Sequence, residues 1–201
     1  MAPANLEHLR VQAAQHGIAL TDTQLDRFRQ YLDLLRTWNR KINLTSVSEP
    51  QAVLDLHFLD SLMVVPLLGS ARRLIDVGSG GGFPGLPIAI AAPALAVTLL
   101  EATHKKAAFL RAAVHALELS AAVIDGRVEE LLKKPFERFD LAISRATFPA
   151  SEWLALGRRL VHQHGAVVVM TGRDPPPGSP TKALSYELPG GELRHLGWYS
   201  A

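Results

Sequence analysis

The stretch RLIDVGSGGGFPG, residues 73–85, decides the fold of this 201-residue chain. Its first five residues form a short apolar run typical of a buried strand, and four glycines then fall within the five positions from Gly78 to Gly82. A helix is predicted to begin near Pro87. Glycines permit a sharp turn and let a ligand lie against bare backbone, so the order strand, glycine turn, helix predicts the floor of a cofactor site.

An acidic residue supports the same interpretation. Glu101 ends the next apolar run, 23 positions after Gly78. At about that spacing a carboxylate can accept the ribose hydroxyls of a nucleoside cofactor, although a solvated strand end is the alternative. Both NAD and S-adenosylmethionine could use these two features. The loop is not a P-loop, because no Gly-Lys-Ser/Thr follows it.

The sequence around the loop alternates between strand and helix. Short apolar runs follow Pro66 at residues 74–77, 97–100, 122–124, 141–143 and 167–170. Helical patterns lie between them, notably over residues 105–119. This alternation predicts a mostly parallel sheet that is covered on both faces. We expect residues 184–188 and 193–199 to form a terminal antiparallel pair joined at Gly190 and Gly191.

The first sixty-odd residues have a helical pattern instead. A short helix is predicted over residues 5–16, with Gly17 ending it. Thr21 and Gln24 have capping-box spacing, and apolar residues recur after them at steps of three and four. A third helix is predicted from Pro50 to about residue 65. The apolar stripe of the second helix requires a partner surface.

Composition sets limits on the chemistry. A hydrophobic content of 48% is enough to build a core, and the net charge of +2 is too small to attract a nucleic acid without a local patch. The chain has no cysteine, which excludes disulfides and cysteine nucleophiles. No apolar stretch is long enough to cross a bilayer, so we expect a cytoplasmic protein with no membrane association.

Several polar residues are candidates for a site. His57, Asp60 and Ser61 would share one helix face, either facing the site or forming a packing network between helices. Arg145 follows the fourth strand at the cofactor side of the sheet, where it is expected to contact the cofactor or a target nucleotide. The Pro-rich segment 174–180 is interpreted as an exposed connector. Basic residues that could position phosphates are Arg36, Arg40, Lys41, Lys105, Lys106 and Arg111.

The glycine loop and five further separated blocks resemble one known family. The loop at residues 76–85 is similar to motif I of class I methyltransferases, and its Phe-Pro-Gly ending is similar to the form in the RsmG (GidB) enzymes. The other blocks follow in that family's order, at residues 31–45, 57–62, 101–106, 126–130 and 143–146. The resemblance covers roughly residues 20–170.

The resemblance implies a class I S-adenosylmethionine methyltransferase with a Rossmann-like α/β fold and a mostly parallel seven-stranded sheet. Residues 1–65 would form an N-terminal helical cap and residues 66–201 the methyltransferase domain, in one compact unit. The implied substrate is 16S rRNA or the 30S subunit, methylated at N7 of guanine 527 in the 530 loop. Carried across by motif, the residues expected to bind the cofactor are Gly78, Phe83, Glu101, Ala102, Thr103, Val128, Glu129 and Arg145.

The chemistry agrees with this assignment. Guanine N7 carries a lone pair and no proton, so its methylation needs positioning and neither a general base nor a covalent nucleophile. We therefore name no catalytic residue and no metal, and we expect a monomer. Two alternatives stay open: an NAD-dependent oxidoreductase, for which a Tyr-x-x-x-Lys pair is missing, and a ribosome-assembly protein that binds RNA without catalysis.

Overall fold

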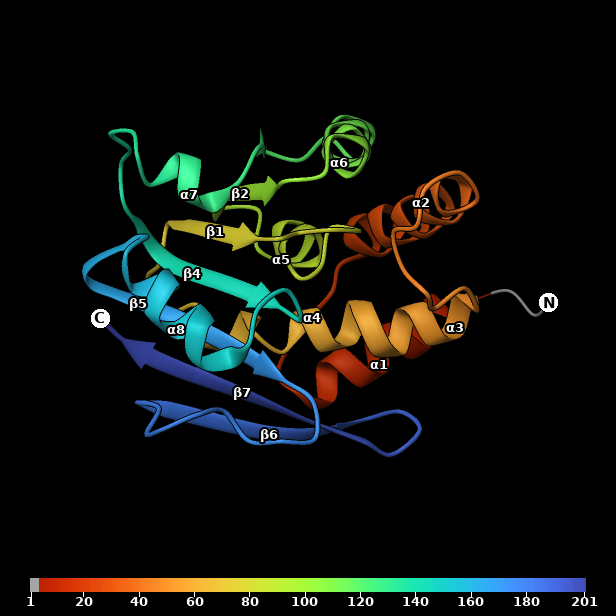
Figure 1. Ribbon diagram of the computed structural model, residues 1–201. Helices are drawn as coiled ribbons and strands as arrows, with labels where there is room; N and C mark the ends of the chain where they lie inside the picture. The colour runs from red at the N-terminus through yellow and green to blue at the C-terminus, as the bar shows by residue number, and fades with distance from the viewer. Residues whose placement is uncertain (1–3) are drawn as a thin grey trace.

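A single seven-stranded sheet forms the centre of the molecule (Figure 1). The computed structural model describes residues 4–201. The strand order is β3-β2-β1-β4-β5-β7-β6. The strands are β1 (Arg73–Val77), β2 (Ala96–Glu101), β3 (Ala121–Asp125), β4 (Phe139–Arg145), β5 (Val161–Thr171), β6 (Lys182–Leu188) and β7 (Glu192–Ser200).

The sheet is parallel except at β7. Strands β1 to β5 pair in parallel, whereas β7 runs antiparallel to both β5 and β6. The chain winds outward from β1 to β3 and then returns to place β4 on the other side of β1. The carboxyl ends of β1 and β4 therefore meet at a topological switch point, where open α/β sheets bind their ligands. This is the predicted fold class.

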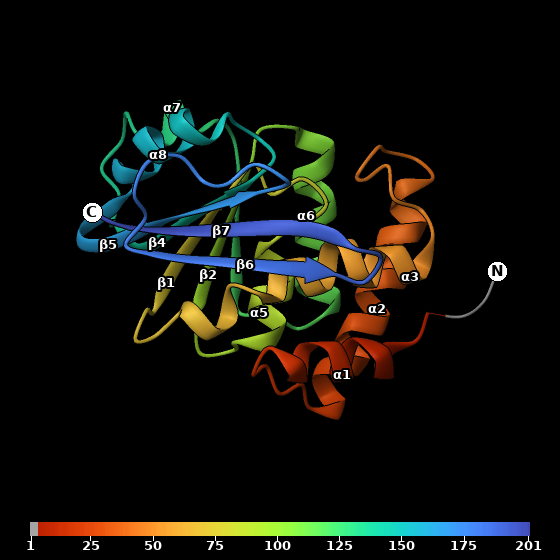
Figure 2. The same ribbon diagram turned by 90° about the horizontal axis from the view of Figure 1, so that it is seen from below.

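Helices cover both faces of the sheet (Figure 2). Successive strand residues alternate between two cores, so that Leu74 belongs to one core and Ile75 to the other. The first core contains α5 (Gly85–Ala91) and α6 (His104–Ala116). The second contains α7 (Val128–Leu131) and α8 (Ala150–Arg158). Such two-sided burial explains why the strands are continuously apolar.

The N-terminal helices pack onto the α5 side of the sheet. Helix α1 is Leu6–Gln15, and α2 is Asp22–Asn39. The predicted capping box is present, because the Thr21 side chain accepts from the Gln24 amide while the Gln24 side chain accepts from the Thr21 amide. The side-chain amide group of Gln24 also donates to the carbonyls of Ile90 and Ala91. The cap of α2 thus also fixes α2 against the end of α5.

The third helix differs from the prediction of one regular α-helix. It begins as α3 (Pro50–Val53), continues as a π-helical turn (Leu54–Leu59) and returns to α-geometry in α4 (Asp60–Leu62). A 3₁₀ turn (Val65–Leu67) follows. An apolar pattern does not distinguish i→i+4 from i→i+5 hydrogen bonding, so the sequence did not reveal this turn. Single π turns are frequent at functional sites.

The C-terminal pair of strands is present as predicted. Strands β6 and β7 are joined at Gly190 and Gly191, both of which have positive φ. Gly197 interrupts the apolar pattern of β7 because a Cβ at this position would lie 2.8 Å from the Cβ of Pro176. Across residues 4–201, no helix has the length and hydropathy needed to span a bilayer.

Candidate functional site

The glycine loop after β1 exposes its backbone. Gly78, Gly80 and Gly82 all have positive φ, between +54° and +94°. Gly78 cannot take a side chain, since a Cβ there would lie 2.4 Å from Thr147. At Gly80, in contrast, a Cβ would meet only the Gly78 carbonyl, 3.9 Å away. The loop therefore offers an open backbone surface at Gly80, where a ligand can approach closely.

Glu101 is tied to this loop. Its side chain is buried, and its two carboxylate oxygens accept hydrogen bonds from the amides of Gly80 at 2.8 Å and Thr103 at 2.7 Å. A solvated strand end, the alternative considered for this residue, is thus wrong. The carboxylate joins the end of β2 to the loop after β1, and each oxygen retains a lone pair for a further donor.

Asp76 lies beneath the same loop. The carboxylate is fully buried, and its Oδ2 atom accepts from the Gly85 amide at 2.9 Å. Its Oδ1 atom has no hydrogen-bond partner within residues 4–201. Burial raises the pKa of Asp76 to about 7, against the opposing effect of the Gly85 amide. Beneath the loop there is therefore a buried carboxyl group with one oxygen atom, Oδ1, that accepts no hydrogen bond within the described residues.

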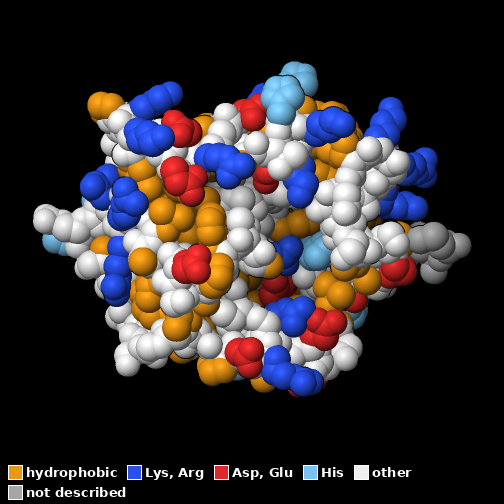
Figure 3. Space-filling view, in the orientation of Figure 1, with side chains coloured by type: hydrophobic (Ala, Val, Ile, Leu, Met, Phe, Trp, Pro, Cys, Tyr) orange, Lys and Arg blue, Asp and Glu red, His pale blue; other side chains and the backbone are white. Residues whose placement is uncertain are grey.

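A cleft of about 1070 Å³ opens beside the loop, at the switch point between β1 and β4. Most of its wall is built from the glycine loop, the π-helical turn, the end of β4 with the loop that follows it, and the loop from β5 to β6. Residues 44–47, Lys106 and the start of β7 complete the wall. Figure 3 shows a hollow near the middle of one face, with basic, acidic and histidine side chains around it. Charged side chains that line the cleft are Asp60, Lys106, Arg145, Arg173, Asp174, Glu192 and Arg194.

Arg145 lies in this cleft with most of its donors engaged. Its Nη1 atom donates to the Asp60 carboxylate at 2.8 Å and to the Leu56 carbonyl at 3.2 Å, and its Nη2 atom is 3.2 Å from His57. The guanidinium carbon is 5.1 Å from the centre of the Phe83 ring, a cation–π contact. The guanidinium is thus fixed between the helical segment and the glycine loop.

His57, Asp60 and Ser61 do not all have the same role: two of them face the cleft, and the third forms a hydrogen bond within its helix. His57 and Asp60 line the cleft, whereas Ser61 donates to the His57 carbonyl within its own helix. The Nε2 atom of His57 lies 2.7 Å from the Thr45 hydroxyl. Burial, and then the charge of Arg145, lower the pKa of His57 to about 4. His57 is therefore uncharged at neutral pH.

The structure brings some of the predicted cofactor residues into the cleft and leaves others beside it. Gly78, Phe83 and Arg145 line the cleft. Glu101 borders it through the Gly80 amide. The remaining predicted residues do not line it: Ala102 and Thr103 are exposed after β2, while Val128, which is buried, and Glu129, which is exposed, begin α7 after β3.

Several residues at the site were not predicted from the sequence, and three of them show why. The Tyr31 hydroxyl donates to the Gly81 carbonyl at 2.5 Å, and the Tyr186 hydroxyl donates to Asp60 at 2.7 Å. Asp174 lines the cleft, so the Pro-rich connector is a loop, as predicted, that also forms part of the site wall. The tyrosines are 50 and 126 residues from their partners, and no local pattern links them.

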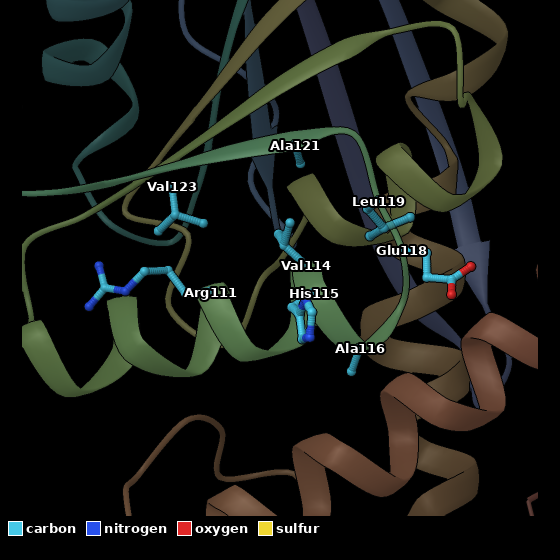
Figure 4. A pocket seen from close by; sticks show the side chains of 8 residues that line it. All are labelled: Arg111, Val114, His115, Ala116, Glu118, Leu119, Ala121 and Val123. Carbon is cyan, nitrogen blue, oxygen red and sulfur yellow. The ribbon is translucent and has the colours of Figure 1, made fainter.

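A second hollow, of about 780 Å³, lies between α6 and β3 and shares no lining residue with the cleft (Figure 4). Its wall includes Arg111, one of the basic residues considered for phosphate binding. Arg111 lies 3.4 Å from the Asp125 carboxylate. Of the basic residues proposed from the sequence, Lys106 is the one that lines the cleft.

Comparison with solved structures identifies the class. The fold matches an O-methyltransferase from Bacillus cereus in complex with SAH, with a TM-score of 0.60 and 19% identity over 86% of this chain and 91% of that chain. It also matches the O-methyltransferase TomG from Streptomyces achromogenes in complex with SAM, with a TM-score of 0.58 and 18% identity over 86% and 90% of the two chains. The fold is that of class I methyltransferases.

Sequence comparison identifies the family. Residues 24–180 match the GidB family model, described as rRNA small subunit methyltransferase G. The ribosomal RNA small subunit methyltransferase G of Syntrophus aciditrophicus is 42% identical over 80% of this chain and 68% of its own length. That of Chromobacterium violaceum is 42% identical over 82% of this chain and 78% of its own length. The chain belongs to the rRNA small subunit methyltransferase G family.

Proposed function

We propose that this chain transfers the methyl group of S-adenosylmethionine to N7 of guanine 527 in the 530 loop of 16S rRNA. The observation that carries the proposal is the family match over residues 24–180, because this range includes the glycine loop, Glu101 and Arg145. S-adenosylmethionine supplies an electrophilic methyl group, and S-adenosylhomocysteine is the other product. The match spans much of the helical segment as well as strands β1 to β5.

The cleft suits a reaction that depends on positioning. The N7 lone pair attacks the methyl carbon while the carbon–sulfur bond breaks, and no proton is transferred in this step. His57 is uncharged at neutral pH and Arg145 is held by fixed partners, so the wall of the cleft changes little as the reaction proceeds. Fixed groups that orient the reactants can supply a large part of the rate enhancement.

We assign the cofactor to the glycine loop and its neighbours. The open backbone at Gly80 and the buried carboxylates of Asp76 and Glu101 fit a cationic nucleoside ligand. Glu101 is proposed to accept the ribose hydroxyls, as its position at the end of β2 favours. The other proposed cofactor contacts are those predicted from the motifs, namely Gly78, Phe83, Ala102, Thr103, Val128, Glu129 and Arg145.

The helical segment is proposed to act as a cap on the substrate side. Residues 1–65 would form this cap and residues 66–201 the methyltransferase domain; residues 1–3 lie outside the described part of the chain. One hydrophobic core includes Phe28 and Leu35 of α2 together with Leu86 and Phe109 of the sheet domain, which favours a single folding unit. We expect a monomer acting on 16S rRNA or the 30S subunit in the cytoplasm.

Two experiments test the proposal. Calorimetric titration of the purified protein should give saturable binding of S-adenosylmethionine and none of NAD. Radiolabelled methyl groups should then pass from S-adenosylmethionine to 30S subunits that lack the modification. Binding of NAD alone would favour the oxidoreductase alternative. Binding of RNA without methyl incorporation would favour the assembly-protein alternative.

A further inference from the structure

We propose that Asp60 is an electrostatic counter-charge that makes the Arg145 side of the cleft compatible with a positively charged methyl donor. This inference rests on the proposed function and goes beyond it, because it assigns a role in cofactor discrimination to a residue of the helical cap. Asp60 would act through Arg145, so it is a positioning residue and not a catalytic one.

The first step is the placement of Arg145 beside the glycine loop. In the sheet, Ile143 of β4 is the register partner of Asp76 of β1, and the Ser144 hydroxyl donates to the Val77 carbonyl at 2.8 Å. Arg145 is the next residue after Ser144, and its guanidinium lies against the Phe83 ring. A ligand that rests on the glycine loop in this cleft is therefore a near neighbour of the guanidinium.

The second step is the sign of the charges. S-adenosylmethionine carries a positive charge on sulfur, and a guanidinium is positively charged at every physiological pH. Like charges at close range in a partly buried cleft repel each other strongly, because the effective dielectric constant is far below that of water. The charge of Arg145 already reaches the floor of the loop, where it opposes the rise that burial causes in the pKa of Asp76. An unpaired Arg145 would thus oppose binding of the donor.

The third step is the neutralisation of that charge by Asp60. Its Oδ2 atom lies 2.8 Å from the Arg145 Nη1 atom, and its side chain is only 4% exposed. The Tyr186 hydroxyl of β6 donates to the other carboxylate oxygen and so holds the carboxylate in place. His57, the other side chain in polar contact with Arg145, adds no charge at neutral pH. Asp60 thus places one negative charge beside the positive charge of Arg145, and Tyr186 of β6 holds the Asp60 carboxylate in position.

The test compares two ligands that differ by one methyl group and one charge. S-adenosylhomocysteine lacks the transferred methyl group and has a neutral sulfur, and it is otherwise identical to the donor. The measured quantity is the ratio of the two dissociation constants, Kd for S-adenosylmethionine divided by Kd for S-adenosylhomocysteine. A purely structural defect weakens both ligands alike and leaves the ratio unchanged, whereas a change of charge near the sulfur alters it.

Two substitutions should change this ratio in opposite directions. Asp60→Asn leaves Arg145 without a counter-charge, so the ratio should rise, on the order of five- to tenfold. Arg145→Met leaves the carboxylate unneutralised, so the ratio should fall by a similar factor. The double variant should return towards the wild-type ratio. Asp140→Asn is the matched control, because that carboxylate pairs with His162 and accepts from the Arg72 and Arg73 amides away from the cleft.

The outcomes separate this inference from the proposed function. A wild-type protein that binds neither ligand contradicts the proposed function and the inference with it. A wild-type protein that binds both, together with an Asp60→Asn ratio within twofold of wild type, overturns the inference alone. If Asp60→Asn does not fold, Arg145→Met decides the question, because this side chain is 16% exposed and lies at the cleft wall. An unchanged or raised ratio in Arg145→Met would then overturn the inference.

Discussion

The Glu101 carboxylate accepts a hydrogen bond from the Gly80 amide at 2.8 Å, and this bond joins the end of β2 to the glycine loop after β1. The two residues are 21 positions apart in the chain. The same carboxylate also accepts from the Thr103 amide. One side chain therefore holds together the glycine loop and the segment after β2, the two segments to which we assign the cofactor.

Replacement of Glu101 by glutamine should weaken cofactor binding. The amide group retains one acceptor, but its NH₂ group would face a backbone donor, so one hydrogen bond of the buried carboxylate is lost. We expect the Kd for S-adenosylmethionine to rise roughly tenfold, corresponding to about 1.4 kcal/mol. Calorimetric titration measures this change.

Asp140→Asn serves as the control for Glu101→Gln. Asp140 likewise accepts two backbone amides, from Arg72 and Arg73, but it lies at the opposite end of the sheet. Its substitution should lower the free energy of unfolding without changing the cofactor affinity. Equal affinities in Glu101→Gln and wild type would refute the assignment of Glu101 to the cofactor.

Gly80→Val should also reduce cofactor affinity. Gly80 has φ +54° and open space around its Cα, so a valine would project into the surface that we assign to the ligand. Gly69→Val is a close match for the backbone strain, because Gly69 has φ +55° and no atom within 4 Å of the position that a Cβ would take. Both variants should lose similar stability in denaturant unfolding, while only Gly80→Val should bind S-adenosylmethionine at least roughly tenfold more weakly. Equal affinities in the two variants would argue against a cofactor floor at Gly80.

Tyr31→Phe should reveal a coupling between the helical cap and the glycine loop, because it removes a hydrogen bond that joins them. The buried hydroxyl donates to the Gly81 carbonyl, and its loss leaves that carbonyl without this donor. We expect a loss of about 1–2 kcal/mol in the free energy of unfolding, together with weaker cofactor binding. Phe28→Leu is the comparison, since Phe28 is buried on the same helix, packs against Phe58 and has no side-chain donor for the loop. It should lose stability and retain affinity; a parallel loss of affinity would show that the effect is general to the cap.

The pH dependence of stability should carry opposite contributions from His57 and Asp76. The pKa of His57 falls from 6.5 to about 4 on folding, mainly through burial, so the unfolded state binds the proton more readily between these values. Its contribution to stability is complete above pH 6.5 and is lost as the pH falls towards 4, by up to about 3 kcal/mol. Burial raises the pKa of Asp76 from 3.8 to about 7, so the folded state binds this proton more readily than the unfolded state. The contribution of Asp76 therefore increases the free energy of unfolding as the pH falls through 7.

Substitutions separate the two contributions. Relative to wild type, His57→Gln should lose less stability on acidification from pH 6.5 to 4, whereas Asp76→Asn should lose more, because the protonation that favours the folded state is no longer available. Urea unfolding at several pH values in this range measures, for each variant, how steeply the free energy of unfolding changes with pH. Slopes identical to wild type in both variants would contradict the assigned environments of these two groups.

Much of the fold could be predicted because its determinants are local. The glycines after β1, the apolar strand runs and the capping box of Thr21 and Gln24 each act within a few residues, and all were found in the structure. The position of Glu101 beside the glycine loop could be predicted because the spacing between consecutive strands of a parallel sheet is regular. The glycine pair at residues 190–191 likewise marked the final hairpin.

The missing parts depend on contacts between distant segments. The Tyr186 hydroxyl reaches Asp60 across 126 residues, and neither residue has a neighbour that marks the pair. Asp174 lines the cleft because β5 ends at the site, which the composition of a Pro-rich loop does not indicate. The π-helical turn at Leu54–Leu59 was missed because its apolar spacing also fits an α-helix.

The measurement that tests the central claim most directly is the mapping of the methylated atom. 30S subunits that lack the modification would be incubated with the protein and S-adenosylmethionine, and the extracted 16S rRNA treated with borohydride and aniline, which cleave the chain at N7-methylguanosine. We predict one new cleavage site, at guanine 527, that depends on both protein and cofactor. Methyl incorporation without cleavage at that guanine would contradict the assignment of N7 of guanine 527 as the target.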